Sequence, residues 1–152
     1  MPNWCENNLR IDADEDTKQK ILTECISLDE YGNNRLDFEK IVPVGDVEDW
    51  YDKHIEKWGT KWNSCDCIID ETVSTGPLEI DMMTAWSPPV PIVVALVEKY
   101  HCAARLEYYE CGMAFRGEYI CRWVIDHVVA DVEKDWNMTE SDFRELGLLK
   151  SA

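Results

Sequence analysis

The chain has 152 residues, a length typical of one domain with a substantial hydrophobic core. Hydrophobic residues make up 45 % and charged residues 30 % of the sequence, a balance that excludes a disordered chain. The longest strongly apolar stretch, residues 92–97, is far shorter than the ~20 residues that cross a bilayer, and the N-terminus lacks the pattern of a signal peptide. We therefore expect a single domain over residues 1–152, located in the cytoplasm and without a membrane partner.

Negative charge is the most unusual property of the composition. The 31 aspartates and glutamates outnumber the 15 lysines and arginines, so the formal net charge is −16. The acidic residues are spread along the chain and do not form a tail. Such a surface repels nucleic acid and membranes and is attracted to basic surfaces, including the nucleic-acid-binding clefts of other proteins. Improved solubility is the simpler explanation of the acidity, and both explanations stay open here.

The first part of the chain predicts a strand, a helix and a second strand. Leu9 and Ile11 alternate with polar residues, as in a half-buried strand, and Asp14 or Asp16 is suited to cap the helix that follows. The segment 35–44 (RLDFEKIVPV) alternates apolar and polar residues in the same way, which predicts a second strand.

From residue 46 to residue 58 the pattern predicts an amphipathic helix, because apolar residues recur at steps of three and one. Gly59 follows where a left-handed residue is expected to end the helix. The apolar side of this helix consists of Val47, Trp50, Tyr51, His54, Ile55 and Trp58. The opposite side carries the acidic residues Asp46, Glu48, Asp49, Asp52 and Glu56.

The remaining chain predicts a hairpin, a helix, a meander and a short terminal helix. Residues 65–70 and 78–86 flank a turn at STGP, and Ser87 is suited to cap the next helix. Aromatic and branched residues in 104–133 predict two or three antiparallel strands, and Thr139 is suited to cap the last helix.

This order of elements is typical of an α+β fold, the ferredoxin-like split βαβ fold. When the inserted amphipathic helix and one hairpin strand are set aside, a βαββαβ alternation remains, followed by a C-terminal β-meander. We therefore expect an antiparallel sheet with both main helices on one face.

Five motifs in order also resemble a known family. They are MPNWCENNLRI, LDFEKIVPV, WGTKWN, TAWSPP and YYECGMAFRGEY. Together they resemble the YubB ferredoxin-like domain family of small phage- and plasmid-encoded proteins. The resemblance extends over residues 1–122 and leaves residues 123–152 as a C-terminal extension. It implies the ferredoxin-like fold and an origin in a mobile genetic element, and it supplies no reaction or cofactor.

The segment WGTKWNSCDC raises the question of a metal site. Cys65 and Cys67 form a C-x-C pair, whereas structural zinc sites usually have two ligand pairs at wider spacing. A site that recruits His101 or other cysteines is an alternative, but packing explains these residues equally well. We expect reduced thiols, no metal and no cofactor.

The tryptophans of the same segment also have two explanations. In the first, the chain turns at Gly59, and Trp58 and Trp62 close one end of the core, with Lys61 as a partner for a carboxylate. In the second, the protein is a small enzyme or a ligand-binding protein with an aromatic pocket. That pocket would be lined by Trp4, Trp58, Lys61, Trp62 and Trp86.

A ferredoxin-like sheet can also bind RNA when its aromatic side chains stack on bases. Here the candidates would be Tyr108, Tyr109, Phe115 and Tyr119. A net charge of −16 disfavours this function, since RNA binding would have to overcome strong repulsion. The sequence shows no phosphate-binding glycine loop and no motif of a hydrolase or metalloprotease, so we do not expect an enzyme.

The sequence thus favours an interaction protein. The expected function is inhibition of a host defence system, of anti-CRISPR or anti-restriction type, by binding the basic nucleic-acid-binding surface of a host protein. Glu48, Asp52 and Glu56 would lie one helical turn apart, ~6 Å, a spacing close to that of DNA phosphates, so the protein would be an acidic nucleic-acid mimic. The predicted contacts are the five acidic residues of the 46–58 helix and a second cluster formed by Asp131, Glu133 and Asp135.

Overall fold

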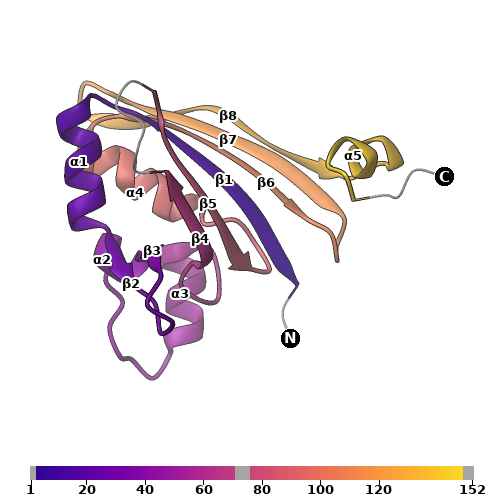
Figure 1. Ribbon diagram of the computed structural model, residues 1–152, viewed down its shortest axis with the longest axis horizontal. Coiled ribbons are helices and arrows are strands. Elements are labelled where there is room, and N and C mark those ends of the chain that lie inside the picture. Colours follow the sequence, from indigo (N-terminus) through magenta and orange to yellow (C-terminus); the bar gives the residue numbers. More distant parts are fainter. Residues whose placement is uncertain (1–2, 71–75, 149–152) are drawn as a thin grey trace.

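The structure is a computed structural model that describes residues 3–70 and 76–148, and it forms two layers (Figure 1). One layer is an antiparallel sheet of six strands in the order β4-β5-β1-β6-β7-β8, and the other consists of helices against one face of that sheet. No helix among the described residues is long and apolar enough to cross a membrane. The elements in chain order are β1 (Trp4–Asp12), α1 (Glu15–Glu24), β2 (Ile26–Leu28), β3 (Asn34–Leu36), α2 (Phe38–Ile41), α3 (Trp50–Trp58), β4 (Cys65–Asp70), β5 (Leu78–Ala85), α4 (Val90–Tyr100), β6 (Ala103–Glu110), β7 (Phe115–Val124), β8 (His127–Asn137) and α5 (Glu140–Glu145).

The predicted ferredoxin-like fold is confirmed, and its unit consists of β1, α1, β4, β5, α4 and β6. The central strand β1 pairs with β5 on one side and with β6 on the other, and β4 pairs with β5. Both hairpin strands therefore belong to the unit, although we expected one of them to lie outside it. Strands β7 and β8 continue the sheet beyond β6 as the predicted meander.

The largest departure from the predicted elements lies in residues 35–44, where a short strand is followed by the helix α2 and not by more strand. The carboxylate of Asp37 accepts a hydrogen bond from the backbone N–H of Glu39 at 3.0 Å, so it acts as the helix cap. The side-chain oxygen of Asn63 accepts from the N–H of Phe38 at 2.9 Å. These two side chains satisfy the first free N–H groups of α2, which an alternating sequence pattern does not reveal.

Two other helices begin later than the sequence suggested. Helix α3 begins at Trp50, because the chain first makes a turn after Gly45, whose φ is +78°. Helix α4 begins at Val90, and Ser87 does not cap it. The Ser87 hydroxyl donates instead to the backbone oxygen of Gly59 at 2.5 Å, which ties the end of α3 to the start of α4.

Other predicted boundaries are confirmed. Gly59 ends α3 in the left-handed conformation, and a capping box between Thr139 and Asp142 begins α5. Strands β4 and β5 pair as a hairpin, and residues 71–75, which include part of the predicted STGP turn, lie outside the described residues.

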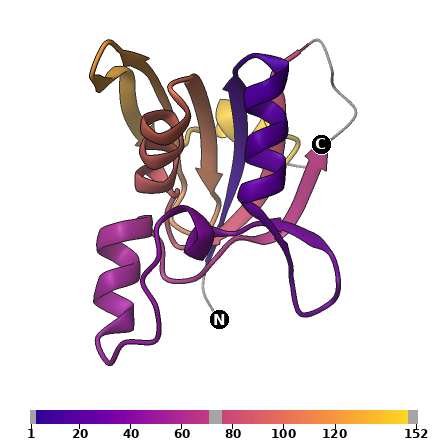
Figure 2. The same ribbon diagram turned by 90° about the vertical axis from the view of Figure 1, so that its left-hand side faces the viewer.

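The core lies between the helices and one face of the sheet. Alternate residues of β1, among them Leu9 and Ile11, point into it and are fully buried, as are Ile92 and Val93 of α4. Helices α1 and α4 cover this face, and α3 contacts α4 at the end of the same layer (Figure 2). Within residues 3–70 and 76–148, the other face of the sheet carries no helix except α5 at one end (Figure 1).

Candidate functional site

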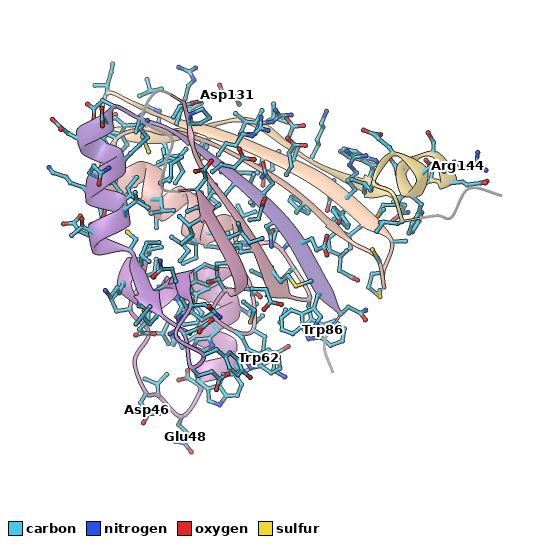
Figure 3. The ribbon with its side chains drawn as sticks, viewed as in Figure 1. Asp46, Glu48, Trp62, Trp86, Asp131 and Arg144 are labelled. Atoms are coloured by element: carbon cyan, nitrogen blue, oxygen red, sulfur yellow. The ribbon has the colours of Figure 1, made fainter. Side chains whose placement is uncertain are left out.

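The five acidic residues predicted on the 46–58 segment are all exposed, and the turn that carries Asp46 and Glu48 lies at the tip of the helical layer, away from the sheet (Figure 3). Only Asp52 and Glu56 belong to α3. The expected row of carboxylates one helical turn apart is therefore wrong for Glu48, which precedes the helix. Glu56 is also partly neutralised, since it lies 3.5 Å from Lys53 and 3.7 Å from Lys57.

The other four carboxylates of this group carry uncompensated charge. Within residues 3–70 and 76–148, no lysine or arginine lies at ion-pair distance from Asp46, Glu48, Asp49 or Asp52. We call these four residues the acidic turn. Its charge faces solvent and is available to a partner.

The apolar side of α3 is only partly buried. Trp58 is 3 % exposed, whereas Trp50, Tyr51 and Ile55 are 40 %, 47 % and 40 % exposed. The side that an amphipathic helix normally packs against its own core therefore faces solvent over most of its length.

These exposed rings continue across the neighbouring loop. The Trp50 ring lies 6.0 Å from that of Tyr51, and the ammonium group of Lys61 lies 5.7 Å from the Tyr51 ring and 4.7 Å from the Trp62 ring. The Trp62 ring in turn lies 6.2 Å from that of Trp4. We call these five residues the aromatic strip. Lys61, expected to pair with a carboxylate, makes cation–π contacts instead.

The aromatic pocket proposed as an alternative has a different arrangement. Trp58 is part of the core: its indole N–H donates to the backbone oxygen of Val42 at 2.8 Å, and its ring stacks on His54 at 4.0 Å. Trp62 and Trp86 both lie near the N-terminal end of β1 and are 37 % and 42 % exposed (Figure 3). The expected tryptophans are thus divided between the core and an exposed surface.

The second predicted acidic cluster lies far from the acidic turn. Asp131 is at the opposite end of the molecule from Asp46 (Figure 3), and its carboxylate pairs with Arg122 at 2.9 Å. Glu133 and Asp135 lie on β8 opposite Tyr119 and Gly117. The two acidic clusters therefore do not form one surface.

The aromatic residues considered for RNA stacking are not on one face. Tyr119 of β7 is buried on the helical side of the sheet. Tyr108 points to the same side, where its ring fills the space that a side chain at Gly117 would occupy. Tyr109, its neighbour in β6, points to the open face. Because side chains alternate between the two faces of a strand, these aromatic residues are divided between the faces and do not form a platform for stacking bases.

The cysteines of the C-x-C pair are engaged locally. The Cys67 thiol donates to the Ser64 hydroxyl at 3.1 Å, and burial raises its pKa above the ordinary value. The Cys65 thiol lies 3.7 Å from the backbone oxygen of Asn63. In the part of the chain that the structure describes, no group of three or more His, Cys, Asp or Glu side chains is placed to hold a metal ion.

Sequence reasoning missed a hollow of about 410 Å³ on the open face of the sheet, which we call the sheet-face pocket. Its floor is made by alternate residues of β5, β1, β6 and β7, and Leu146 beyond α5 lies at its rim. The polar side chains that line it are Glu6, Asn8, Asp66, Asp81, Glu107, Tyr109 and Arg116. Strand alternation could have placed these residues on one face, but the order of the strands was needed to bring them together.

Two contacts order the pocket near α5. The hydroxyl of Tyr109 donates to the carboxylate of Glu6, and burial together with this bond raises the pKa of Tyr109. The guanidinium of Arg116 lies 3.1 Å from Asp142 and 3.2 Å from Glu145, so it holds α5 at the end of the sheet. Its positive charge is therefore already neutralised.

Comparisons with known proteins support the fold and correct the family. A family model described as the ferredoxin-like domain in Api92-like protein matches residues 57–146. The crystal structure of a protein api92 from Yersinia pseudotuberculosis is similar in fold, with a TM-score of 0.62 and 10 % sequence identity over 88 % of this chain and 99 % of that chain. No curated protein matches the chain significantly.

The expected membership in the YubB family is wrong. The matching family model is the Api92-like one, and it includes most of the segment after residue 122 that the resemblance left outside. That segment contains β8, which pairs with β7 along its whole length, so it is part of the same sheet. This chain belongs to the family of ferredoxin-like domains found in Api92-like proteins.

Proposed function

We propose that this protein acts by binding a partner protein that presents a basic surface, and that it is not an enzyme. The contact surface consists of the acidic turn and the aromatic strip, which meet on α3. One observation carries the proposal: α3 leaves the apolar side of an amphipathic helix exposed next to four unpaired carboxylates.

The aromatic strip has the composition of a protein interface. Tryptophan and tyrosine contribute most binding energy at protein interfaces, because they bury a large rigid surface at a small entropic cost. With Trp50, Tyr51 and Trp62 each exposed by 37–47 %, these three rings and Ile55 present roughly 300 Å² of surface. Exposed apolar patches of this size on soluble proteins are often functional.

The acidic turn would steer a basic partner toward this contact surface by electrostatic attraction. Exposed carboxylates accelerate the encounter with a basic partner, and their attraction weakens as salt shortens the screening length below about 8 Å. The aromatic strip is much less sensitive to salt. Binding through both parts would therefore become slower in high salt but would retain a salt-resistant component.

In its specific form, the proposal identifies the partner as a host defence protein of CRISPR or restriction type, whose nucleic-acid-binding surface is occupied by the acidic turn. This form is supported by the net charge of −16 and by the absence of catalytic motifs in the sequence. The phage or plasmid origin no longer supports it, because the family assignment has changed. Nucleic-acid mimicry is also less well supported, since only Asp52 and Glu56 keep the one-turn spacing.

The test is a comparison of immobilised variants against a bacterial lysate. The triple variant Asp46→Asn, Glu48→Gln, Asp52→Asn removes charge from the acidic turn. A control triple variant neutralises exposed carboxylates elsewhere, at Asp12, Glu30 and Glu98. A third variant, Trp62→Ser, shortens the aromatic strip without any change of charge.

The proposal predicts a captured protein that binds the parent and the control and is lost from both the triple variant and the Trp62 variant. DNA should release this protein if its nucleic-acid-binding surface is the one that is occupied. Equal losses from the triple variant and the control would show that only net charge matters, and the proposed surface would then be rejected.

A further inference from the structure

The open face of the sheet carries a second surface, whose charge favours cationic ligands. It lies on the side of the sheet opposite α1 and α4, where α5 at one end is the only helix among the described residues (Figure 1). The sheet-face pocket is the hollow at its centre. This surface is separate from the acidic turn, so the inference below does not depend on the function proposed above.

Carboxylates dominate the lining of the pocket. Glu6, Asp81 and Glu107 come from the three adjacent strands β1, β5 and β6. Asp66 joins them from β4, where the pairing with β5 shifts between Cys65 and Ile68. Asp66 has a left-handed φ of +48° in this bulge, a costly conformation for a residue with a side chain.

The basic side chains near these carboxylates already form ion pairs. Arg116 is the basic residue among those that line the pocket, and Asp142 and Glu145 of α5 neutralise it. Glu107 also has a partner, since Arg105 lies 3.1 Å from it, but both side chains are about 40 % exposed. The pocket as a whole keeps an excess of negative charge.

The arrangement favours an extended organic cation over a metal ion. Neighbouring strands are about 4.8 Å apart, so the carboxylates from β4 to β6 are spread over roughly 14 Å. A single ion cannot contact groups so far apart, in agreement with the absence of a metal-type cluster among the described residues. Met83 and the ring of Tyr109 give the floor an apolar part, which suits the aliphatic stems of lysine and arginine.

We propose that the open face of the sheet binds an extended basic peptide segment of a partner protein, whose lysine or arginine side chains enter the sheet-face pocket. The segment lies across the strands, with its cationic groups near Asp66, Asp81 and Glu107. Charge complementarity is the reason for this occupant. Asp81 and Glu107 lie opposite Asn8 on its two sides, with Glu6 and Asp66 nearby, and a basic peptide carries several cations that can reach these separate carboxylates at once. An extended chain of about five residues spans the distance from β4 to β6.

The experiment measures the binding of a fluorescein-labelled peptide of alternating lysine and glycine by fluorescence anisotropy. The pocket variant is Asp81→Asn with Glu107→Gln, in which both new side chains keep a hydrogen-bond acceptor. The matched control is Glu30→Gln with Glu98→Gln, which changes the net charge equally at exposed carboxylates outside both the pocket and the acidic turn. A peptide with acetylated lysines and free spermidine complete the set.

We expect the pocket variant to weaken peptide binding about tenfold and the control variant less than about twofold. Acetylation of the lysines should abolish binding, and amide shifts in an NMR titration of the parent protein should map to β1, β5 and β6. Equal weakening by both variants, or failure of the peptide to bind the parent, would overturn the proposal. Spermidine that binds as tightly as the peptide and with the same variant dependence would also overturn it, in favour of a small-amine site.

Discussion

Replacement of Trp58 is the sharpest test of how α3 is positioned. Trp58 is the buried residue of α3, and its ring contacts Phe38 at 5.8 Å and stacks on His54 at 4.0 Å. Its N–H donates to the Val42 oxygen at 2.8 Å. Asp52 of the acidic turn and Trp50 and Tyr51 of the aromatic strip lie on α3, so the place where the two parts meet depends on this one side chain.

The expected cost of Trp58→Ala follows from these contacts. A buried tryptophan removes about 200 Å² from water, worth at most about 5 kcal/mol at about 25 cal/mol per Å². Measured truncations of this kind cost about 3–5 kcal/mol, since the surrounding side chains relax only in part. We therefore expect the free energy of unfolding to fall by about 4 kcal/mol. Trp58→Phe keeps an aromatic ring but loses the pyrrole part of the indole and the hydrogen bond to Val42, so it should cost about 2 kcal/mol.

Urea unfolding followed by circular dichroism measures both variants against the parent protein. The alanine variant should also lose partner binding, although no charge has changed, because the acidic turn and the aromatic strip would no longer be held in place. If Trp58→Ala costs no more than Trp58→Phe, the ring does not anchor α3, and the reasoning is refuted. A binding loss without any loss of stability would refute it equally.

Three further predictions concern stability and thiol chemistry. Burial raises the pKa of Asp37, but hydrogen bonds from Asn63 and other groups outweigh it and hold that pKa below its ordinary value, so Asp37→Asn should destabilise the protein at pH 7. Urea unfolding measures the resulting difference in unfolding free energy between parent and variant. This difference should be largest above about pH 5 and should shrink as the pH falls below about 4, and a difference that stays constant with pH would contradict the prediction. Gly59→Ala should lower the unfolding free energy by about 1–3 kcal/mol in the same assay. The reason is that the φ of Gly59 is +79° and an added Cβ would lie 2.7 Å from Cδ of Pro91. A substitution without effect would argue against this turn. Iodoacetamide followed by mass spectrometry should label exposed Cys111 well before the four buried cysteines, and labelling of all thiols at one rate would contradict their burial.

The alternation of apolar residues was sufficient to predict most strands and the fold class. Leu9 and Ile11 face the core as expected, because side chains of a strand point alternately to its two faces and only one face of this sheet is covered. The left-handed glycine after α3 and the cap of α5 were also correct, since both depend on residues adjacent in sequence.

Segment 35–44 shows where local patterns fail. Its alternation is that of a strand, yet Asn63, distant in sequence, accepts the N–H of Phe38 and helps to start a helix. A similar limit applies to α3, whose periodicity correctly predicted a helix with one apolar side. Of that side Trp58 is buried, whereas Trp50 and Tyr51 are 40 % and 47 % exposed, and the helical periodicity does not distinguish between these residues.

The sequence by itself determined the fold class, the excess of negative charge and the residues that alternate on each strand. Local sterics and hydrophobic burial act over a few residues, so these properties can be inferred without coordinates. The tertiary structure decided which charges share a surface: it separated Asp131 from Asp46, paired Glu56 with lysines, and gathered Glu6, Asp81 and Glu107 on one open face. These groupings depend on the order of strands in the sheet and on how the helices pack, because both bring together residues that are far apart in the chain.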